Sequence, residues 1–113
     1  MLKRFLIGLL ICFSAATTAS QESTTIDIVA KRFQFTPSEI TVKKGQQVTL
    51  RLSSMDVAHG MLVEPLRIQA QFKKGSPATV TFVPQETGDF AGGCAHFCGA
   101  GHGKMHFVVH VRE

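Results

Sequence analysis

A strong excess of one charge is missing from this sequence of 113 residues, which has 12 lysines and arginines against 8 aspartates and glutamates. Lys3 and Arg4 lie in a segment that we predict is removed, which leaves ten basic residues and a formal charge of about +2. A nucleic-acid surface needs a dense basic patch, whereas Lys43-Lys44 and Lys73-Lys74 are separate pairs in predicted turns. The sequence therefore predicts no nucleic-acid partner.

Long apolar runs are also missing. Residues 5–13 are apolar but fall short of the roughly 20 residues that a membrane-spanning helix needs. They follow two basic residues and precede small residues at 15–20, a pattern typical of a secretory signal peptide. We predict a signal peptide at residues 1–20, which contains Cys12, and one exported, periplasmic domain at residues 21–113. The alternative is an uncleaved segment that tethers the domain to the membrane.

Helical periodicity is absent as well, since no stretch of ten or more residues has apolar side chains at helical spacing between capping residues. Apolar and polar residues instead alternate in short segments separated by turn-forming residues, which predicts an antiparallel β-sandwich or barrel. Most phenylalanines are expected in the core, namely Phe33, Phe35, Phe72, Phe82 and Phe107. The alternating apolar residues are Ile26, Ile28 and Ala30; Val48, Leu50 and Leu52; Leu66, Ile68, Ala70 and Phe72; Ala78, Val80 and Phe82; and Phe107, Val109 and Val111.

Three histidines near the end of the chain, His102, His106 and His110, are spaced four residues apart. On a helix they would form one metal-binding face. The neighbouring glycines and the pair Val108-Val109 disfavour a helix and favour a strand. We therefore expect His106 and His110 to be ordinary surface residues.

Soft donor atoms are concentrated in residues 94–105, with the thiols of Cys94 and Cys98, the imidazole of His102 and the thioether of Met105. Thiolates and thioethers select copper or zinc over magnesium and calcium. Methionine is not among the usual zinc ligands, which favours copper. Glycines interrupt the segment and would let the backbone fold into a tight ligand loop.

Three other interpretations of this segment remain open. A mononuclear blue-copper site could use Cys98, His102 and Met105, but it would leave the thiol of Cys94 idle in an oxidising compartment. A copper-delivery or storage protein would use the same donors and release the metal. A metal-free domain could instead join Cys94 to Cys98 in a disulfide, which would give no reason for the spacing of His102 and Met105.

The pattern C-x3-C-x3-H-x2-M in residues 94–105, together with the upstream Asp56-Val57-Ala58-His59-Gly60, resembles the binuclear copper (CuA) domain of cytochrome c oxidase subunit II, which nitrous oxide reductase shares. The resemblance covers residues 33–111. It implies that two copper ions are bridged by two cysteine sulfurs. The implied ligands are Cys94 and Cys98 as bridges, His59 and Met105 on one copper, and His102 with the carbonyl of His96 on the other.

The resemblance also implies a Greek-key β-sandwich of cupredoxin type, in which the loop after Ser53 carries His59 next to the ligand loop. It implies one-electron transfer with no turnover by the domain itself, and a redox partner such as a c-type cytochrome or a terminal-oxidase-like complex. Asp56 is the candidate for orienting the ring of His59.

The chain departs from full oxidase subunits in three respects. It has no tryptophan and no tyrosine, although the family uses an aromatic patch with tryptophan to accept electrons from cytochrome c. It has no transmembrane hairpin before the domain. His96 stands where the family commonly has a glutamate, and its side chain could itself be a ligand. We therefore expect a free-standing or differently partnered periplasmic domain.

Overall fold

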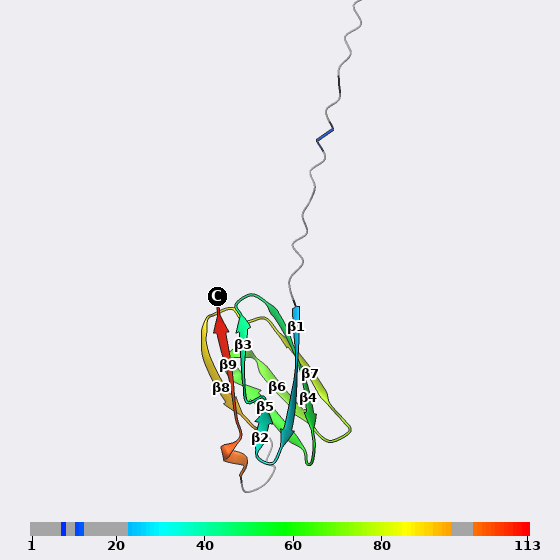
Figure 1. Cartoon of the computed structure of the whole chain (residues 1–113), viewed down its shortest axis with the longest axis vertical. Coiled ribbons are helices and arrows are strands. Elements are labelled where there is room, and N and C mark those ends of the chain that lie inside the picture. Colours follow the sequence, from blue (N-terminus) through cyan, green and yellow to red (C-terminus); the bar gives the residue numbers. More distant parts are fainter. Residues whose placement is uncertain (1–7, 9–10, 13–22, 96–100) are drawn as a thin grey trace, which may run out of the picture.

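The computed structural model describes residues 8, 11–12, 23–95 and 101–113. Its strands form two sheets, one with the order β2-β1-β4-β7 and one with the order β3-β9-β8-β5-β6 (Figure 1). Two short 3-10 turns, η1 (Glu64–Leu66) and η2 (His102–Lys104), accompany them. The strands are β1 (Ser23–Lys31), β2 (Gln34–Thr36), β3 (Glu39–Lys43), β4 (Gln47–Ser54), β5 (His59–Val63), β6 (Ile68–Phe72), β7 (Ala78–Phe82), β8 (Gly88–Gly93) and β9 (His106–Arg112).

The prediction of an all-β sandwich is confirmed, but the expectation of purely antiparallel pairing is wrong. β1 pairs in parallel with β4, with Ile28 opposite Leu52, and β3 pairs in parallel with β9, with Ile40 opposite Val109. Both pairs join strands that are distant in sequence, because the chain crosses between the sheets after β2, β3, β4, β6 and β7. Alternation within a strand reports the buried face and carries no information about the direction of its neighbour.

The core lies between the two sheets and is built by the alternation that the sequence shows. Every second residue of β4 and of β9 is buried, and the apolar ones, which are all of them except Ser54, belong to one hydrophobic cluster. Each such side chain contributes about 1.5–3 kcal/mol through removal of apolar surface from water. Phe35 of β2 and Phe107 of β9 link the sheets, with ring centroids 6.0 Å apart in an edge-to-face arrangement.

Two local predictions are wrong. The strand expected at residues 66–72 begins at Ile68, because Pro65 lies in η1 and Arg67 takes the left-handed conformation with φ of 56°. Phe33 is 38% exposed and lies in the turn between β1 and β2, whereas the four other phenylalanines expected in the core are buried.

Strands β2, β3, β5 and β8 were not predicted, and β5 and β8 show no clean alternation. Four of the five residues of β5 are buried, and β8 has the glycine-rich sequence Gly-Asp-Phe-Ala-Gly-Gly. The glycines of β8 permit close packing, since a β-carbon on Gly92 would overlap the backbone carbonyl of Leu62 in β5. Only glycine fits there, so β8 is held tightly against β5.

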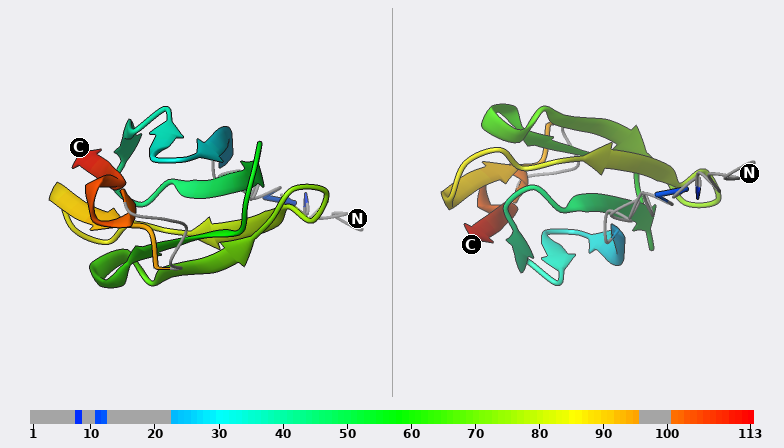
Figure 2. Two further views of the ribbon diagram at one scale, coloured as in Figure 1. Left: turned by 90° about the horizontal axis from the view of Figure 1, so that it is seen from below. Right: turned by 90° about the horizontal axis from the view of Figure 1, so that it is seen from above.

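The connections that matter for function gather at one end of the sandwich, which we call the loop end. It comprises residues 32–33, 55–58, 73–77, 94–95 and 101–105 and is drawn lowest in Figure 1, where β8 ends and η2 lies. The left view of Figure 2 looks onto this end from below. β1 begins and β9 ends at the opposite, far end. Among the described residues, no helix has the length and apolarity needed to cross a bilayer.

Candidate metal centre

His59 is the first residue of β5, where the sequence predicted a loop position, and its side chain is fully buried. Its ring packs against Phe72 of the adjacent strand, with centroids 6.3 Å apart. Nε2 lies 2.8 Å from Oδ1 of Asp56. Nδ1 is buried and has no hydrogen-bond partner in the part of the chain that the structure describes. A buried ring nitrogen without a partner is costly for a core histidine and is what a metal ligand needs.

The carboxylate of Asp56 decides which nitrogen of His59 carries the proton. Burial acts to raise the pKa of Asp56, but hydrogen bonds from the backbone N–H of Arg32 (2.8 Å), the ring of His59 and the N–H of Val57 (2.7 Å) hold that pKa well below its usual value. The carboxylate is therefore ionised and accepts from Nε2–H. In the neutral imidazole, the lone pair is then on Nδ1, the form that binds metals.

The loop before His59 is fixed by local hydrogen bonds. The hydroxyl of Ser54 donates to the carbonyl of Val57 and accepts from the N–H of Asp56 at 3.2 Å. Asp56 in turn accepts from Val57, as a short side chain at a turn commonly does. The predicted role of Asp56 in orienting His59 agrees with this geometry. The ring is thus held in place before any metal binds.

Two further predicted ligands lie beside this strand. Cys94 directly follows β8, is half-buried and packs against the core, and the N–H of Ala95 donates to the carbonyl of Gly60 at 3.2 Å. Met105 directly precedes β9 and is 2% exposed. A β-carbon on Gly93 would lie only 2.7 Å from the carbonyl oxygen of Met105. The fold therefore brings the segments that carry His59, Cys94 and Met105 together at the loop end.

The side chains of the remaining predicted ligands are not described by the structure. His96 and Cys98 lie outside the described residues, and the side chain of His102, which opens η2, is not described either. Within the described residues, no three histidine, cysteine, aspartate or glutamate side chains gather into a metal-binding group. The complete ligand set stays a prediction.

The turn between β1 and β2 contacts both halves of the candidate centre, a role that the sequence did not reveal. The backbone N–H of Arg32 holds Asp56, as described above. The ring of Phe33 lies against Gly101 so closely that a β-carbon on Gly101 would overlap it. No motif signalled this, because Phe33 follows the same alternating pattern as the core phenylalanines.

His106 and His110 are not part of the centre. His106 is exposed, and His110 is half-exposed on the outer face of β9, as predicted. His110 lies between two carboxylates, with Nδ1 2.7 Å from Asp89 Oδ1 and Nε2 3.2 Å from Glu39 Oε1. Hydrogen bonds to Asp89 and then to Glu39 raise the pKa of His110.

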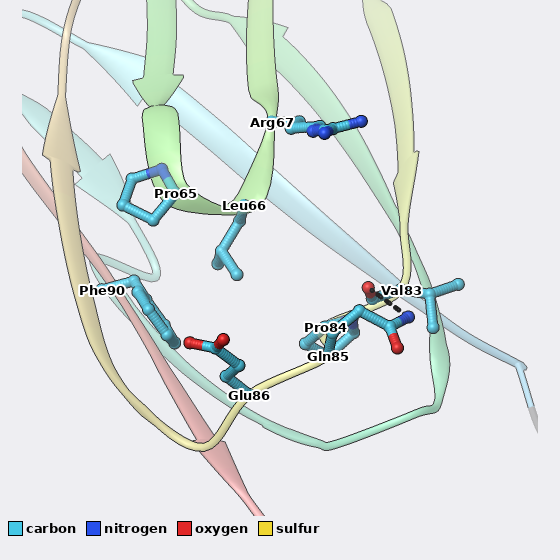
Figure 3. Close-up of a pocket in the computed structure, with 8 residues that line it drawn as sticks. All are labelled: Pro65, Leu66, Arg67, Val83, Pro84, Gln85, Glu86 and Phe90. Carbon is cyan, nitrogen blue, oxygen red and sulfur yellow. Dashed lines mark hydrogen bonds between the residues drawn. The ribbon is translucent and has the colours of Figure 1, made fainter.

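A pocket of about 510 Å³ lies at the far end, away from the candidate ligands (Figure 3). It is formed by η1 and the segment that leads from β7 into β8, and the side-chain amide of Gln85 donates to the carbonyl of Val83 at its rim. None of the predicted ligands lines it. Its lining residues are Pro65, Leu66, Arg67, Val83, Pro84, Gln85, Glu86 and Phe90.

The fold and this site define a class of protein: a two-sheet β-sandwich that carries a buried, pre-oriented histidine and sulfur donors at one end. The chain belongs to the cupredoxin-like domain family, which its sequence matches over residues 4–107.

Curated relatives that are 30% identical or more include oxidase subunits and nitrous-oxide reductases. Cytochrome c oxidase subunit 2 of Thermus thermophilus is 30% identical over 89 residues, 79% of this chain and 66% of that protein. Nitrous-oxide reductase of Cupriavidus necator is 33% identical over 72% of this chain and 13% of that protein. The chain thus spans at most about two thirds of these relatives. The predicted resemblance to oxidase subunit II and nitrous oxide reductase is confirmed.

Solved structures support the same fold. The periplasmic domain of subunit II of cytochrome oxidase (CoxB) of Bradyrhizobium japonicum superposes with a TM-score of 0.73 at 19% identity, covering 79% of this chain and 83% of that one. Auracyanin A, a blue copper protein from Chloroflexus aurantiacus, has a TM-score of 0.63 at 17% identity, covering 80% of this chain and all of that one. At these identities the likeness is one of fold.

Proposed function

We propose that this chain is an exported one-electron carrier that holds a binuclear copper centre of CuA type. The observation that carries the proposal is His59, which is fully buried, has Nε2 held by an ionised carboxylate and leaves Nδ1 without a partner among the described residues. The segments of Cys94 and Met105 lie next to it. Imidazole, thiolate and thioether together form a donor set suited to copper.

In this proposal, Cys94 and Cys98 would hold both copper ions, His59 and Met105 would complete one of them, and His102 with the carbonyl of His96 would complete the other. A copper pair of this kind, when bound, accepts and releases single electrons.

The chain supplies position and shielding. Asp56 holds the ring of His59 in one orientation and one tautomer, and the burial of His59 and Met105 keeps water away from their donor atoms. Because both sit at the ends of hydrogen-bonded strands, their positions change little with the charge of the site. A stiff site of this kind keeps the reorganisation that accompanies electron transfer small.

The proposed partners are a c-type cytochrome or a terminal-oxidase-like complex, and the proposed location is the periplasm or the outer face of the membrane. Two observations support them. The curated relatives include oxidase subunits, and the CoxB domain of similar fold is described as periplasmic. The sequence adds a predicted signal peptide at residues 1–20, of which the structure describes only residues 8, 11 and 12.

Electron paramagnetic resonance with metal analysis tests the centre directly. The chain, loaded with copper and mildly oxidised, is expected to bind two copper ions and to give a seven-line hyperfine pattern, because one unpaired electron is shared by two copper nuclei. A four-line pattern with one copper would indicate a mononuclear site and refute bridging by Cys94. Uptake of Cu(I) alone, with no signal after oxidation, would indicate copper delivery instead.

Cys94→Ser separates the binuclear from the mononuclear interpretation in a second way. A binuclear centre is expected to lose its colour and its seven-line pattern in this variant, because one bridge is gone. A mononuclear site built on Cys98 would keep its colour. Thiol titration before copper loading tests the remaining alternative, since a disulfide between Cys94 and Cys98 would leave neither thiol reactive.

A further inference from the structure

Charge is distributed unevenly between the two ends of the sandwich. Four exposed lysines lie at or next to the loop end: Lys31 at the end of β1, Lys73 and Lys74 in the turn after β6, and Lys104 in η2. Within the described residues, none of the four takes part in an ion pair, whereas Lys44, Arg51 and Arg112 each face a carboxylate. We call these four residues the lysine rim.

Negative charge does not balance the lysine rim. The one carboxylate among the described loop-end residues is Asp56, whose oxygens already accept from Arg32, Val57 and His59. Residues 96–100 have the sequence His-Phe-Cys-Gly-Ala and add no carboxylate. All other carboxylates among the described residues lie at the far end or are paired with Arg51 or His110. Those at the far end are Glu64, Glu86, Asp89 and Glu113.

The loop end also carries two exposed apolar side chains. Phe33 is 38% exposed and Met55 is 62% exposed. The two are brought near one another because the N–H of Met55 donates to the carbonyl of Ala30, and the N–H of Arg32 donates to Asp56. Phe33 also lies against Gly101 of the ligand loop. Exposed apolar side chains at the same end as charged residues are a combination typical of a protein docking face.

We infer that the loop end is the docking face for an acidic redox protein, whose carboxylates surround its own electron-carrying group. This inference rests on the proposed function, because the loop end also carries the candidate copper ligands His59, Cys94 and Met105. Complementary charge mainly accelerates encounter, and the effect falls as salt screens it. A membrane with anionic lipids would also attract lysines, but it would bring no electron carrier to the centre.

The chain offers a matched control. Lys73-Lys74-Gly75 and Lys43-Lys44-Gly45 form similar turns, and each glycine has φ of 79°, but the first turn is at the loop end and the second is at the far end. Lys73→Gln/Lys74→Gln removes half of the lysine rim, whereas Lys43→Gln/Lys44→Gln removes the same charge elsewhere. The net charge of the two double variants is identical.

The test is stopped-flow electron transfer from a reduced c-type cytochrome with an acidic haem edge to the copper-loaded chain, over a series of salt concentrations. At low salt, Lys73→Gln/Lys74→Gln is expected to lower the second-order rate about three- to tenfold and to flatten its salt dependence. Lys43→Gln/Lys44→Gln is expected to leave the rate within about twofold. Equal effects of the two double variants, or a faster reaction with a basic cytochrome, would overturn the inference.

Two further measurements distinguish failure of the docking-face inference from failure of the proposed electron-carrier function. Hydroquinone, an uncharged reductant, reports whether the centre accepts electrons at all. If it does not, calorimetric binding of the metal-free chain to the acidic cytochrome at low salt still tests the docking face, and absence of binding refutes it. Loss of binding to phosphatidylglycerol vesicles, with cytochrome rates unchanged in the Lys73 and Lys74 variant, would assign the rim to lipid and overturn the inference.

Discussion

His59 and His110 are both hydrogen-bonded to aspartates, yet their surroundings give them opposite roles. His59 is fully buried and shares one nitrogen with Asp56, and its other nitrogen has no partner among the described residues. His110 lies on the outer face of the sheet, and both of its nitrogens face carboxylates. The neutral ring of His59 would therefore have its lone pair on Nδ1, whereas the two carboxylates beside His110 stabilise that ring as a cation.

The comparison shows that a histidine–carboxylate pair is not in itself a sign of a metal site. What separates the two residues is the second nitrogen and the water around it. At His110, Glu39 occupies the position that a metal would need, and solvent reduces the cost of any unmet hydrogen bond. At His59 burial makes the unpaired nitrogen costly, so a ligand for it is expected.

Exchange of each histidine for glutamine gives the largest expected difference. His59→Gln is expected to abolish the binuclear copper signal and to lower the bound copper, because a buried ligand is lost. His110→Gln is expected to keep both. Copper analysis measures the bound copper of the two copper-loaded variants, and electron paramagnetic resonance measures their signal. Loss of the signal in His110→Gln, or its retention in His59→Gln, would reverse the roles assigned here.

The two aspartates provide the next test. Asp56→Asn keeps the shape of the side chain but removes the charge that fixes the tautomer of His59, and copper affinity is expected to fall about 10- to 100-fold. Asp89→Asn, the equivalent change beside His110, is expected to leave affinity unchanged. Competition titration with a chelator of known affinity measures both. An equal loss of copper affinity in the two variants would mean that Asp56 acts only through the stability of the fold and not by orienting His59.

The next test concerns the ligand loop, residues 94–105, where Phe33 contacts Gly101. Gly101→Ala is expected to lower the free energy of unfolding by about 1–3 kcal/mol, because the new β-carbon overlaps the ring. Gly103→Ala is the control, since a β-carbon there meets nothing within 4 Å. Urea unfolding of both variants, without metal, gives the difference. Equal stabilities would refute the packing role of Phe33.

The smallest expected effect is the pH dependence that His110 contributes. Because its pKa is raised above the ordinary value of 6.5, its stabilising contribution is fully present below that value and is lost as the pH rises through the raised pKa. The pKa of Asp89 is lowered, first by His110 and then by Arg112, so its contribution is lost as the pH falls through that lowered value.

The network is therefore most stabilising at mildly acidic pH. Urea midpoints followed from mildly acidic to alkaline pH should converge for the unmodified chain and His110→Gln as the pH rises. His106→Gln, a change at an exposed neighbour, should run parallel to the unmodified chain throughout. Curves for His110→Gln that stay equally separated at every pH would show that the ring does not titrate as described.

Much of the fold could be predicted from the sequence, because a strand with one buried face has alternating apolar and polar residues, as β4 and β9 do. β5 and β8 could not, since a strand buried on both faces or rich in glycine has no alternating pattern. The parallel pairing of β1 with β4 was equally hidden, because it depends on how the chain crosses between sheets.

The sequence predicted those parts of the candidate site in which the side chain itself does the chemistry. The link between His59 and Asp56 follows from a short motif of adjacent residues. The contributions of Arg32 and Phe33 do not, because one acts through a backbone N–H and the other through contact with a glycine distant in sequence. Neither role requires a distinctive side-chain pattern.

The C-terminal residue Glu113 lies at the far end, after a seven-residue strand that runs the length of the sandwich from the loop end (Figure 1). At about 3.3 Å per residue, this strand separates the two ends by about 20 Å. A chain anchored to an electrode or a bead through its C-terminus would point its candidate copper ligands outward. Immobilisation at that residue would therefore give an oriented film ready for voltammetry.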